Sequence, residues 1–216
     1  MTPEELAARH PRLYHVTTPG AWEVMRAHGL LSTEALLRRI GQPPAEIERL
    51  TTQRRRARVV FDPTPLGRVV LNDNIPLSES KLAPYLDDGL SPADWLRMLN
   101  QRVFFWVAHK KMKLLRDARA NQRDRREVLV FDTLGLVGAH AERVEIAPFN
   151  TGNTLHRPVR RGLSTFTPLR GMSYADWRRK RMPPNLGLDH IVEVLIRDGV
   201  PDIERHLIER REVVSA

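Results

Sequence analysis

Short runs of apolar, β-branched and aromatic residues recur along the whole chain and predict many strands. Such residues pack well on a pleated, half-buried surface. The run Val103–Ala108 is the strongest strand candidate, because it is continuous and aromatic. The other predicted strands are Leu13–Thr17, Val59–Phe61, Val69–Leu71, Val128–Phe131, Val144–Ile146, His190–Ile196 and His206–Val213.

Apolar residues at helical spacing predict helices mainly in the first half of the chain. One helix follows Pro19 and carries Trp22, with Gly29 in the place of a left-handed C-terminal cap. Ser32 and Ser91 have side chains that cap helix N-termini, so each predicts a helix after it. Further helices are predicted after Pro43–Pro44, where a polar helix ends in Arg54–Arg56, over Lys110–Arg126 and over Tyr174–Arg181.

The order of these elements predicts an α+β fold, with helices concentrated in the N-terminal half, instead of alternating βαβ units. A chain of 216 residues, of which 41% are hydrophobic, can bury one substantial core. No internal repeat, low-complexity segment or linker divides the sequence. We therefore expect one domain over residues 1–216.

The charge of the chain favours polyanionic partners. The 35 basic residues exceed the 26 acidic ones, for a net charge of +9, and all but five of the basic residues are arginines. Guanidinium groups match phosphate geometry and stack on bases. Nucleic acid, phosphates and dinucleotides are therefore candidate ligands, although an arginine-rich proteome would give a similar excess.

Several classes of protein are excluded by composition and by missing motifs. Without cysteine, the chain has no disulfide scaffold, thiol nucleophile or cysteine zinc site. The longest apolar run, Val103–Ala108, is too short to span a bilayer, and the N-terminus has no signal-peptide pattern, so we expect a soluble cytoplasmic protein without a membrane partner. G-x-G-x-x-G, P-loop and H-E-x-x-H motifs are absent, and the eight histidines are scattered singly, so no metal site is expected.

Segments near the N-terminus carry a family resemblance. Leu13–Thr17, a following helix and then Gly29–Ser32 resemble the first strand and helix of ADP-ribosyltransferases, especially the DarT type that modifies nucleic acid. The stretch Thr51–Val60, which contains Arg54–Arg56, is similar to the arginine-bearing segment of that type.

The resemblance continues in the same order downstream. The aromatic strand Val103–Trp106 is similar to the third element of the family. Glu193–Ile196, followed by Val200–Ile203, is similar to the strand that bears the catalytic glutamate. Each segment is short, and it is their order over most of the chain that makes the resemblance specific.

The resemblance implies an ADP-ribosyltransferase-like split antiparallel sheet, with NAD⁺ as a substrate. In the family, a histidine and a nearby threonine of the first strand hold NAD⁺, which gives this role to His15 and Thr17. Glu193 would be the catalytic carboxylate and Arg55 a second catalytic residue. The further contacts to NAD⁺ that the resemblance implies are Leu30, Arg56, Phe104 and Phe105.

Strand alternation gives these residues a geometry. It places His15 and Thr17 on one face of their strand and Tyr14 on the other. It also places Glu193 on a face shared with Ile191 and Leu195. A carboxylate on an apolar face needs a reason, and a buried site is one.

The acceptor of ADP-ribose is open, and the resemblance points to a nucleic-acid base. Asn150–Thr154 and Arg160–Arg161 offer amides, hydroxyls and guanidinium groups in an aperiodic stretch, which would suit acceptor binding. Ile191 stands where many transferases carry a second Glu or Gln, which argues against arginine-specific protein modification. The resemblance also leaves room for a toxin or phage-defence effector with an antitoxin or regulator as partner.

Two other functions compete with this one. A non-catalytic nucleic-acid-binding protein would keep the arginine-rich surfaces and use His15 and Glu193 structurally. An enzyme that removes a phosphate from RNA with NAD⁺ would rely on basic residues and would not need Glu193.

Overall fold

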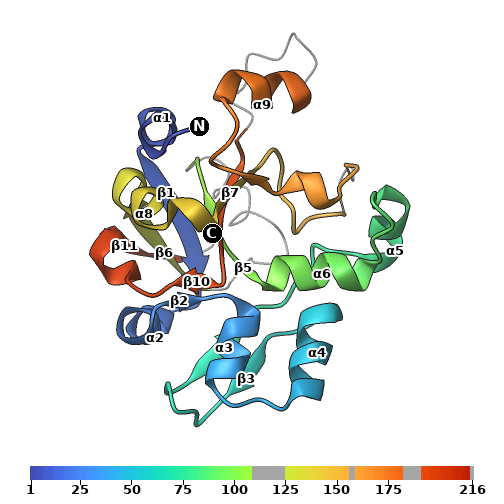
Figure 1. Ribbon diagram of the computed structural model, residues 1–216. Helices are drawn as coiled ribbons and strands as arrows, with labels where there is room; N and C mark the ends of the chain where they lie inside the picture. The colour runs from blue at the N-terminus through green and yellow to red at the C-terminus, as the bar shows by residue number, and fades with distance from the viewer. Residues whose placement is uncertain (109–124, 156–158, 182–190, 215–216) are drawn as a thin grey trace.

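A seven-stranded sheet forms the centre of the computed structural model, which describes residues 1–108, 125–155, 159–181 and 191–214 (Figure 1). Its strand order is β11-β6-β1-β5-β9-β7-β8, and every neighbouring pair is antiparallel. The strands are β1 (Arg12–Thr17), β5 (Arg102–Trp106), β6 (Arg125–Asp132), β7 (Val144–Ala147), β8 (Thr167–Pro168), β9 (Glu193–Arg197) and β11 (Leu207–Val214).

Most of the described helices precede β5 in the chain, and several of them pack against the sheet. Ser32 and Ser91 cap α3 and α6 with their side chains, as their sequence positions predict. The helices are α1 (Pro3–Arg9), α2 (Ala21–His28), α3 (Thr33–Arg39), α4 (Pro44–Thr52), α5 (Glu79–Leu82), α6 (Pro92–Asn100), α8 (Thr133–His140) and α9 (Tyr174–Arg181). The 3-10 turns are η1 (Ala83–Tyr85), η3 (Ala141–Arg143), η4 (Leu163–Thr165) and η5 (Ile203–His206).

Alternating side chains of the strands build a core on each face of the sheet. On the first face, Phe105 and its neighbours pack against α1, α2, α8 and α9, which contribute Leu6, Trp22, Leu136 and Trp177. On the second face, Phe104 and Leu195 pack against Trp95 of α6. The sheet therefore holds two separate apolar layers apart.

A third apolar cluster lies away from the sheet, in the lower part of Figure 1. There α3 and α4 pack against a hairpin of β3 (Val59–Phe61) and β4 (Val69–Leu71). Its buried members are Leu37, Ile40, Leu50, Leu66, Val69 and Leu71.

Two short strands, β2 (Leu30–Leu31) and β10 (Gly199–Val200), form a separate antiparallel pair. The backbones of the two strands pack closely, with no room for a side chain at two glycines. A Cβ on Gly29 would lie 2.7 Å from Cα of Pro201, and a Cβ on Gly199 would lie 2.5 Å from the main-chain oxygen of Leu30. Both glycines also have positive φ, +86° and +142°. The segment after β9 is thus fitted closely to the segment after α2.

The structure confirms the predicted α+β class and most of the predicted strands. Several boundaries differ from the sequence prediction. The helix predicted to end in Arg54–Arg56 ends at Thr52, the strand predicted over Val103–Ala108 ends at Trp106, and the strand predicted from His206 begins at Leu207. Arg125 and Arg126 pair with β11 and belong to strand β6, so the helix predicted over Lys110–Arg126 is wrong at that end, and its residues 110–124 lie outside the described residues. β9 begins at Glu193 instead of His190, which also lies outside the described residues. Within those residues, no helix is both long and apolar enough to cross a membrane.

Candidate functional site

Glu193, the first residue of β9, is a buried carboxylate that accepts two hydrogen bonds from Thr151. Its side chain is 2% exposed. Oε2 accepts hydrogen bonds from the main-chain N–H of Thr151 at 3.1 Å and from its hydroxyl at 2.7 Å. The cross-strand neighbours of Glu193 are Trp106 of β5 and Ala147 of β7. Glu193 is therefore buried, as its position on an apolar strand face suggests.

Arg161 places a second buried charge behind Thr151. Its side chain is 2% exposed and donates a 3.0 Å hydrogen bond to the main-chain oxygen of Thr151. The guanidinium carbon lies 5.6 Å from the ring centre of Trp95 and 5.0 Å from that of Phe149. Burial lowers the pKa of Arg161 to about 10, and the negative charge of Glu193 opposes that shift.

The segment that carries Thr151 and Arg161 is fastened to the turn η1 by its backbone. The main-chain N–H of Arg161 donates to the oxygen of Tyr85, and the N–H of Asp87 donates to the oxygen of Arg161, both at 2.9 Å. The Asp88 carboxylate accepts from the N–H of Leu163 at 2.7 Å. These bonds fix the position of Arg161 independently of its side chain.

The central sheet is weakly joined between β1 and β5. β1 pairs with β6 over its whole length, from Arg12 opposite Asp132 to Thr17 opposite Glu127. Between β1 and β5 the register contains one pair, Tyr14 opposite Trp106. Because Trp106 also lies opposite Glu193, this pair forms a row with the buried carboxylate on one face of the sheet.

His15 occupies the place where β1 and β5 separate. Its Nδ1 lies 2.9 Å from the main-chain oxygen of Phe104. Because a carbonyl oxygen only accepts, Nδ1 carries the proton, and Nε2 of the neutral ring keeps a lone pair. Burial lowers the pKa of His15, while the hydrogen bond to Phe104 opposes the shift. The imidazole is therefore neutral near pH 7.

The residues expected to contact NAD⁺ from the strands lie on both faces of the sheet. Thr17 is buried, and the His15 ring lies 5.9 Å from the ring of Phe105 on the first face. Phe105 itself is fully buried, edge-on to Phe131 at 5.6 Å, and Leu30 is buried in the same core cluster. Phe104 lies with Glu193 on the second face, where it is half-buried.

The three arginines of the triplet have different surroundings. Arg55 donates to the oxygens of Leu50, Asn72 and Asn100 at 2.5, 3.0 and 3.1 Å, and its burial lowers its pKa to about 10, a shift that the charge of Asp73 opposes. This guanidinium is a clamp between segments. Arg56 is exposed.

Arg54 differs from both of its neighbours. Its Nη2 donates to the oxygen of Ile75 at 2.6 Å, whereas its buried Nε has no hydrogen-bond partner among the residues that the structure describes. The segment that Arg54 contacts leads towards Glu193, because the oxygen of Pro76 accepts from the N–H of Thr154 at 2.9 Å, three residues after Thr151. Arg54 is thereby connected to the carboxylate through two short segments.

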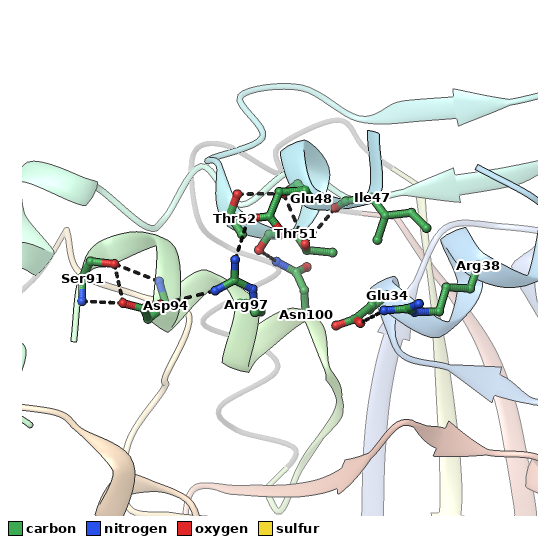
Figure 2. A network of polar contacts seen from close by, with 10 residues as sticks. All are labelled: Glu34, Arg38, Ile47, Glu48, Thr51, Thr52, Ser91, Asp94, Arg97 and Asn100. Atoms are coloured by element: carbon green, nitrogen blue, oxygen red, sulfur yellow. Dashed lines mark hydrogen bonds and ion pairs between the residues drawn. The ribbon is translucent and has the colours of Figure 1, made fainter. Parts of the chain in front are cut away.

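A polar network at the end of α6 extends the Arg55 clamp (Figure 2). Asn100 accepts from Arg55 and donates to the oxygen of Thr51 at 2.9 Å. Arg97 extends from the same helix between Asp94 and Glu48. This network borders a cavity of about 240 Å³ between α3, α4 and α6, whose lining does not include Glu193.

Two histidines and an aspartate meet at a place that the sequence did not indicate. His140 Nε2 lies 2.6 Å from one carboxylate oxygen of Asp202, and His206 Nε2 lies 3.2 Å from the other. Their potential ligand atoms lie within 4.8 Å of one another. Arg143, however, donates to Nδ1 of His140 at 2.9 Å, so Nε2 carries the proton and faces the aspartate. A metal-bound Nε2 would need the opposite tautomer, so the arrangement favours a hydrogen-bonded lock.

The basic helix α9 offers charge but little aromatic surface. Trp177 is 1% exposed, and the Tyr174 ring is covered by the Arg9 guanidinium at 3.7 Å. Trp177 is therefore not available for stacking on a nucleic-acid base. Arg178 and Arg179 remain exposed.

Sequence reasoning found Glu193 but missed the groups around it. Alternation places Tyr14 on the face opposite His15, and it is Tyr14 that shares a row with Glu193. From the sequence, Thr151 and Arg161 are predicted only as parts of an acceptor-binding loop. The usable signal was that a carboxylate on an apolar strand needs hydrogen-bond donors, which this polar segment can supply.

Comparison with known proteins gives one family match. A family model described as a family of unknown function (DUF7002) matches residues 11–207. No curated protein matches the chain.

Proposed function

The chain belongs to the DUF7002 family, and we propose that it is an NAD⁺-dependent ADP-ribosyltransferase. The observation that carries this proposal is the junction of β1 and β5. One register pair joins the two strands there, the imidazole of His15 takes part in the junction, and the buried Glu193 lies in the adjacent strand position. An imidazole on the first face of the sheet, and aromatic rings with a carboxylate on the second face, thus border the junction where the sheet is weakest.

A split sheet of the ADP-ribosyltransferase type belongs to the same proposal. Six register pairs between β1 and β6, against one between β1 and β5, support a division of the sheet into β11-β6-β1 and β5-β9-β7-β8. Such a division exposes main-chain groups at the junction, and His15 already satisfies one of them, the oxygen of Phe104.

The reaction requires that charge develop at the ribose. The bond between C1′ and the nicotinamide nitrogen breaks, its electron pair leaves with neutral nicotinamide, and C1′ becomes positive. A nucleophilic atom of the acceptor then bonds to C1′ and loses its proton. Glu193 supplies the negative charge that stabilises C1′. Tyr14 and Trp106 offer aromatic faces beside it, and Nε2 of His15 offers an acceptor for a hydroxyl or an amide N–H.

The arginines that would contact the pyrophosphate of NAD⁺ are those with N–H groups not already used in hydrogen bonds to the described part of the protein. The guanidinium of Arg55 already donates to three oxygens of the protein. In this proposal, Arg54 and Arg56 therefore bind the pyrophosphate of NAD⁺. Arg54 Nε is a buried donor without a partner in the described ranges, and Arg56 is exposed. Either guanidinium can form a charge-assisted hydrogen bond to phosphate.

The acceptor in this proposal is a nucleic-acid base. The net charge of +9 and the exposed pair Arg178 and Arg179 on α9 support a polyanionic acceptor. Proteins with a positive or a negative net charge can also accept ADP-ribose. The acceptor is therefore tested separately from the activity on NAD⁺.

The test is release of nicotinamide from NAD⁺, with and without single-stranded DNA or RNA. We expect release by the wild-type protein and a mass increase on an oligonucleotide equal to one ADP-ribose. Glu142→Gln, which removes an exposed carboxylate on η3, is the matched control for Glu193→Gln. Absence of NAD⁺ binding in calorimetry at millimolar concentration would contradict the proposal.

A further inference from the structure

We infer that Thr151 and Arg161 are positioning residues that hold the Glu193 carboxylate in one orientation as a charged group. This inference rests on the proposed function, because it concerns the same carboxylate. Neither residue belongs to a strand or helix, and neither needs to touch NAD⁺ for the role. Each acts through another group: Thr151 through Glu193, and Arg161 through Thr151.

The first step is that one carboxylate oxygen receives two donors from a single residue. The N–H and the hydroxyl of Thr151 both reach Oε2 of Glu193. Two donors on one oxygen restrict rotation of the carboxylate about its terminal bond. They also favour the ionised form over the protonated form, because hydrogen bonds of this kind are stronger to a charge.

The second step is that Arg161 supplies a positive charge without a direct ion pair. Among the described residues its guanidinium donates to main-chain oxygens, those of Thr151, Asn153 and Val159. A buried cation without a carboxylate in contact is costly to maintain. The cost of burying this cation is offset if its charge attracts the Glu193 carboxylate, which lies on the other side of Thr151. The electrostatic interaction between Arg161 and Glu193 is attractive, as this requires.

The third step is that the position of Arg161 does not depend on Glu193. The backbone bonds to Tyr85 and Asp87 hold its main chain, and the rings of Trp95 and Phe149 flank its guanidinium. Thr151 is held in turn by Arg161 and by its own neighbours. The carboxylate is therefore placed by a scaffold that stays the same when the charge of Glu193 changes.

Thr151→Val and Thr151→Ser separate this role from simple packing. Valine keeps the shape and removes the hydroxyl donor, whereas serine keeps both donors. The pKa of Glu193 is measured by carbon NMR on protein with labelled glutamate carboxyls, with Glu193→Gln identifying the signal. We expect Thr151→Val to raise that pKa and to lower kcat for nicotinamide release about tenfold, with KM for NAD⁺ nearly unchanged, and Thr151→Ser to restore both.

The corresponding pair for the charge is Arg161→Met and Arg161→Lys. Methionine removes the cation, so the pKa of Glu193 should rise and the acid limb of the pH profile should move to higher pH. Lysine keeps the cation and should move the profile less. Thr154→Val is the matched control, because Thr154 lies in the same segment and bonds to Ser78 instead of Glu193.

The outcomes distinguish this inference from the proposed function. If Glu193→Gln abolishes nicotinamide release while Thr151→Val and Arg161→Met keep the wild-type pKa of Glu193, the inference is overturned and the function stands. If the wild-type protein releases no nicotinamide, the function fails, and the NMR titration still decides whether Thr151 and Arg161 set the charge. Should Arg161→Met not fold, Thr151→Val alone gives the decision.

Discussion

The imidazole of His15 and the main-chain oxygen of Phe104 are joined by a 2.9 Å hydrogen bond across the junction of β1 and β5. A side chain thus satisfies a carbonyl at a place where a sheet would ordinarily use a main-chain N–H. The bond also decides which nitrogen of the ring is protonated, because the carbonyl oxygen can only accept.

The ionisation of His15 is the first prediction. Its pKa should lie below the ordinary value of 6.5, since burial disfavours the charged ring. Long-range nitrogen–proton NMR should show the Nδ1–H form near pH 7. Because the folded pKa is lowered, the stabilising effect of the neutral ring is complete above pH 6.5 and is lost as the pH falls through the folded value. A His15 that titrates at or above 6.5 would contradict this account.

Replacement of the carboxylate gives the second prediction. Glu193→Gln keeps the size of the side chain and an acceptor for Thr151 while removing the charge aimed at C1′. We expect a loss in kcat on the order of a hundredfold or more, with little change in NAD⁺ affinity or in Tm. Nicotinamide release per folded molecule is the measurement. Equal rates in variant and wild type would refute the catalytic role, and a large fall in Tm would indicate a structural one.

The arginine triplet gives the third prediction, in which neighbouring residues behave differently. Arg55→Gln removes the donors that serve Leu50, Asn72 and Asn100, so we expect a loss of about 2–4 kcal/mol in unfolding free energy. Arg56→Gln, at an exposed position, should change it by less than about 0.5 kcal/mol. Urea denaturation measures both. Similar effects of the two substitutions would show that Arg55 is not a clamp.

The fourth prediction concerns Asp202 and pH. Burial raises the pKa of Asp202, but hydrogen bonds from His140, from the backbone and from His206 outweigh burial and lower it below 3.8. A lowered folded pKa means that the stabilisation is present above pH 3.8 and is lost as the pH falls through the folded value. Asp202→Asn should cost about 2 kcal/mol at pH 7 and progressively less in acid. Urea titrations at several pH values test this, and a pH-independent difference would count against the lock.

Helix α9 gives the fifth prediction. Arg178→Gln together with Arg179→Gln should weaken binding of a single-stranded oligonucleotide and reduce the dependence of log K on log salt, because fewer counterions are released. Arg38→Gln, at an exposed position on α3, is a control of equal charge change per site. Fluorescence anisotropy at two salt concentrations gives both slopes. Identical slopes for the α9 variant and the wild type would place the nucleic-acid surface elsewhere.

The strands and helix starts could be predicted because their signals are local. Alternation in Leu13–Thr17 correctly separates the buried Leu13 and Thr17 from Tyr14, which packs on the opposite face. The Ser91 cap and the apolar spacing after it correctly gave α6. Ile191 shows where the same rule stops: it lies before β9 begins and packs in the first core, so it does not share the face of Leu195.

The site could be predicted only as a set of separate residues, because its contacts join distant parts of the chain. Thr151 and Glu193 are 42 positions apart, and His140 and Asp202 are 62 apart. No periodicity encodes such pairs, which depend on the order of strands in the sheet. The burial of Phe105 and the hydrogen bonds of Arg55 also depend on the tertiary fold, because the segments that contact these side chains are distant in the sequence.

The close backbone packing at Gly29 and at Gly199 has a consequence for how the sequence can vary. Elsewhere in the core, a larger side chain can be accommodated when a neighbouring side chain becomes smaller. At these two glycines the opposing atoms belong to the main chain of Leu30, Leu31 and Pro201, and no substitution can shorten them. A residue with a side chain at either position therefore has no second-site suppressor among its contacts. In a selection for compensating changes, only reversion would recover the original fit.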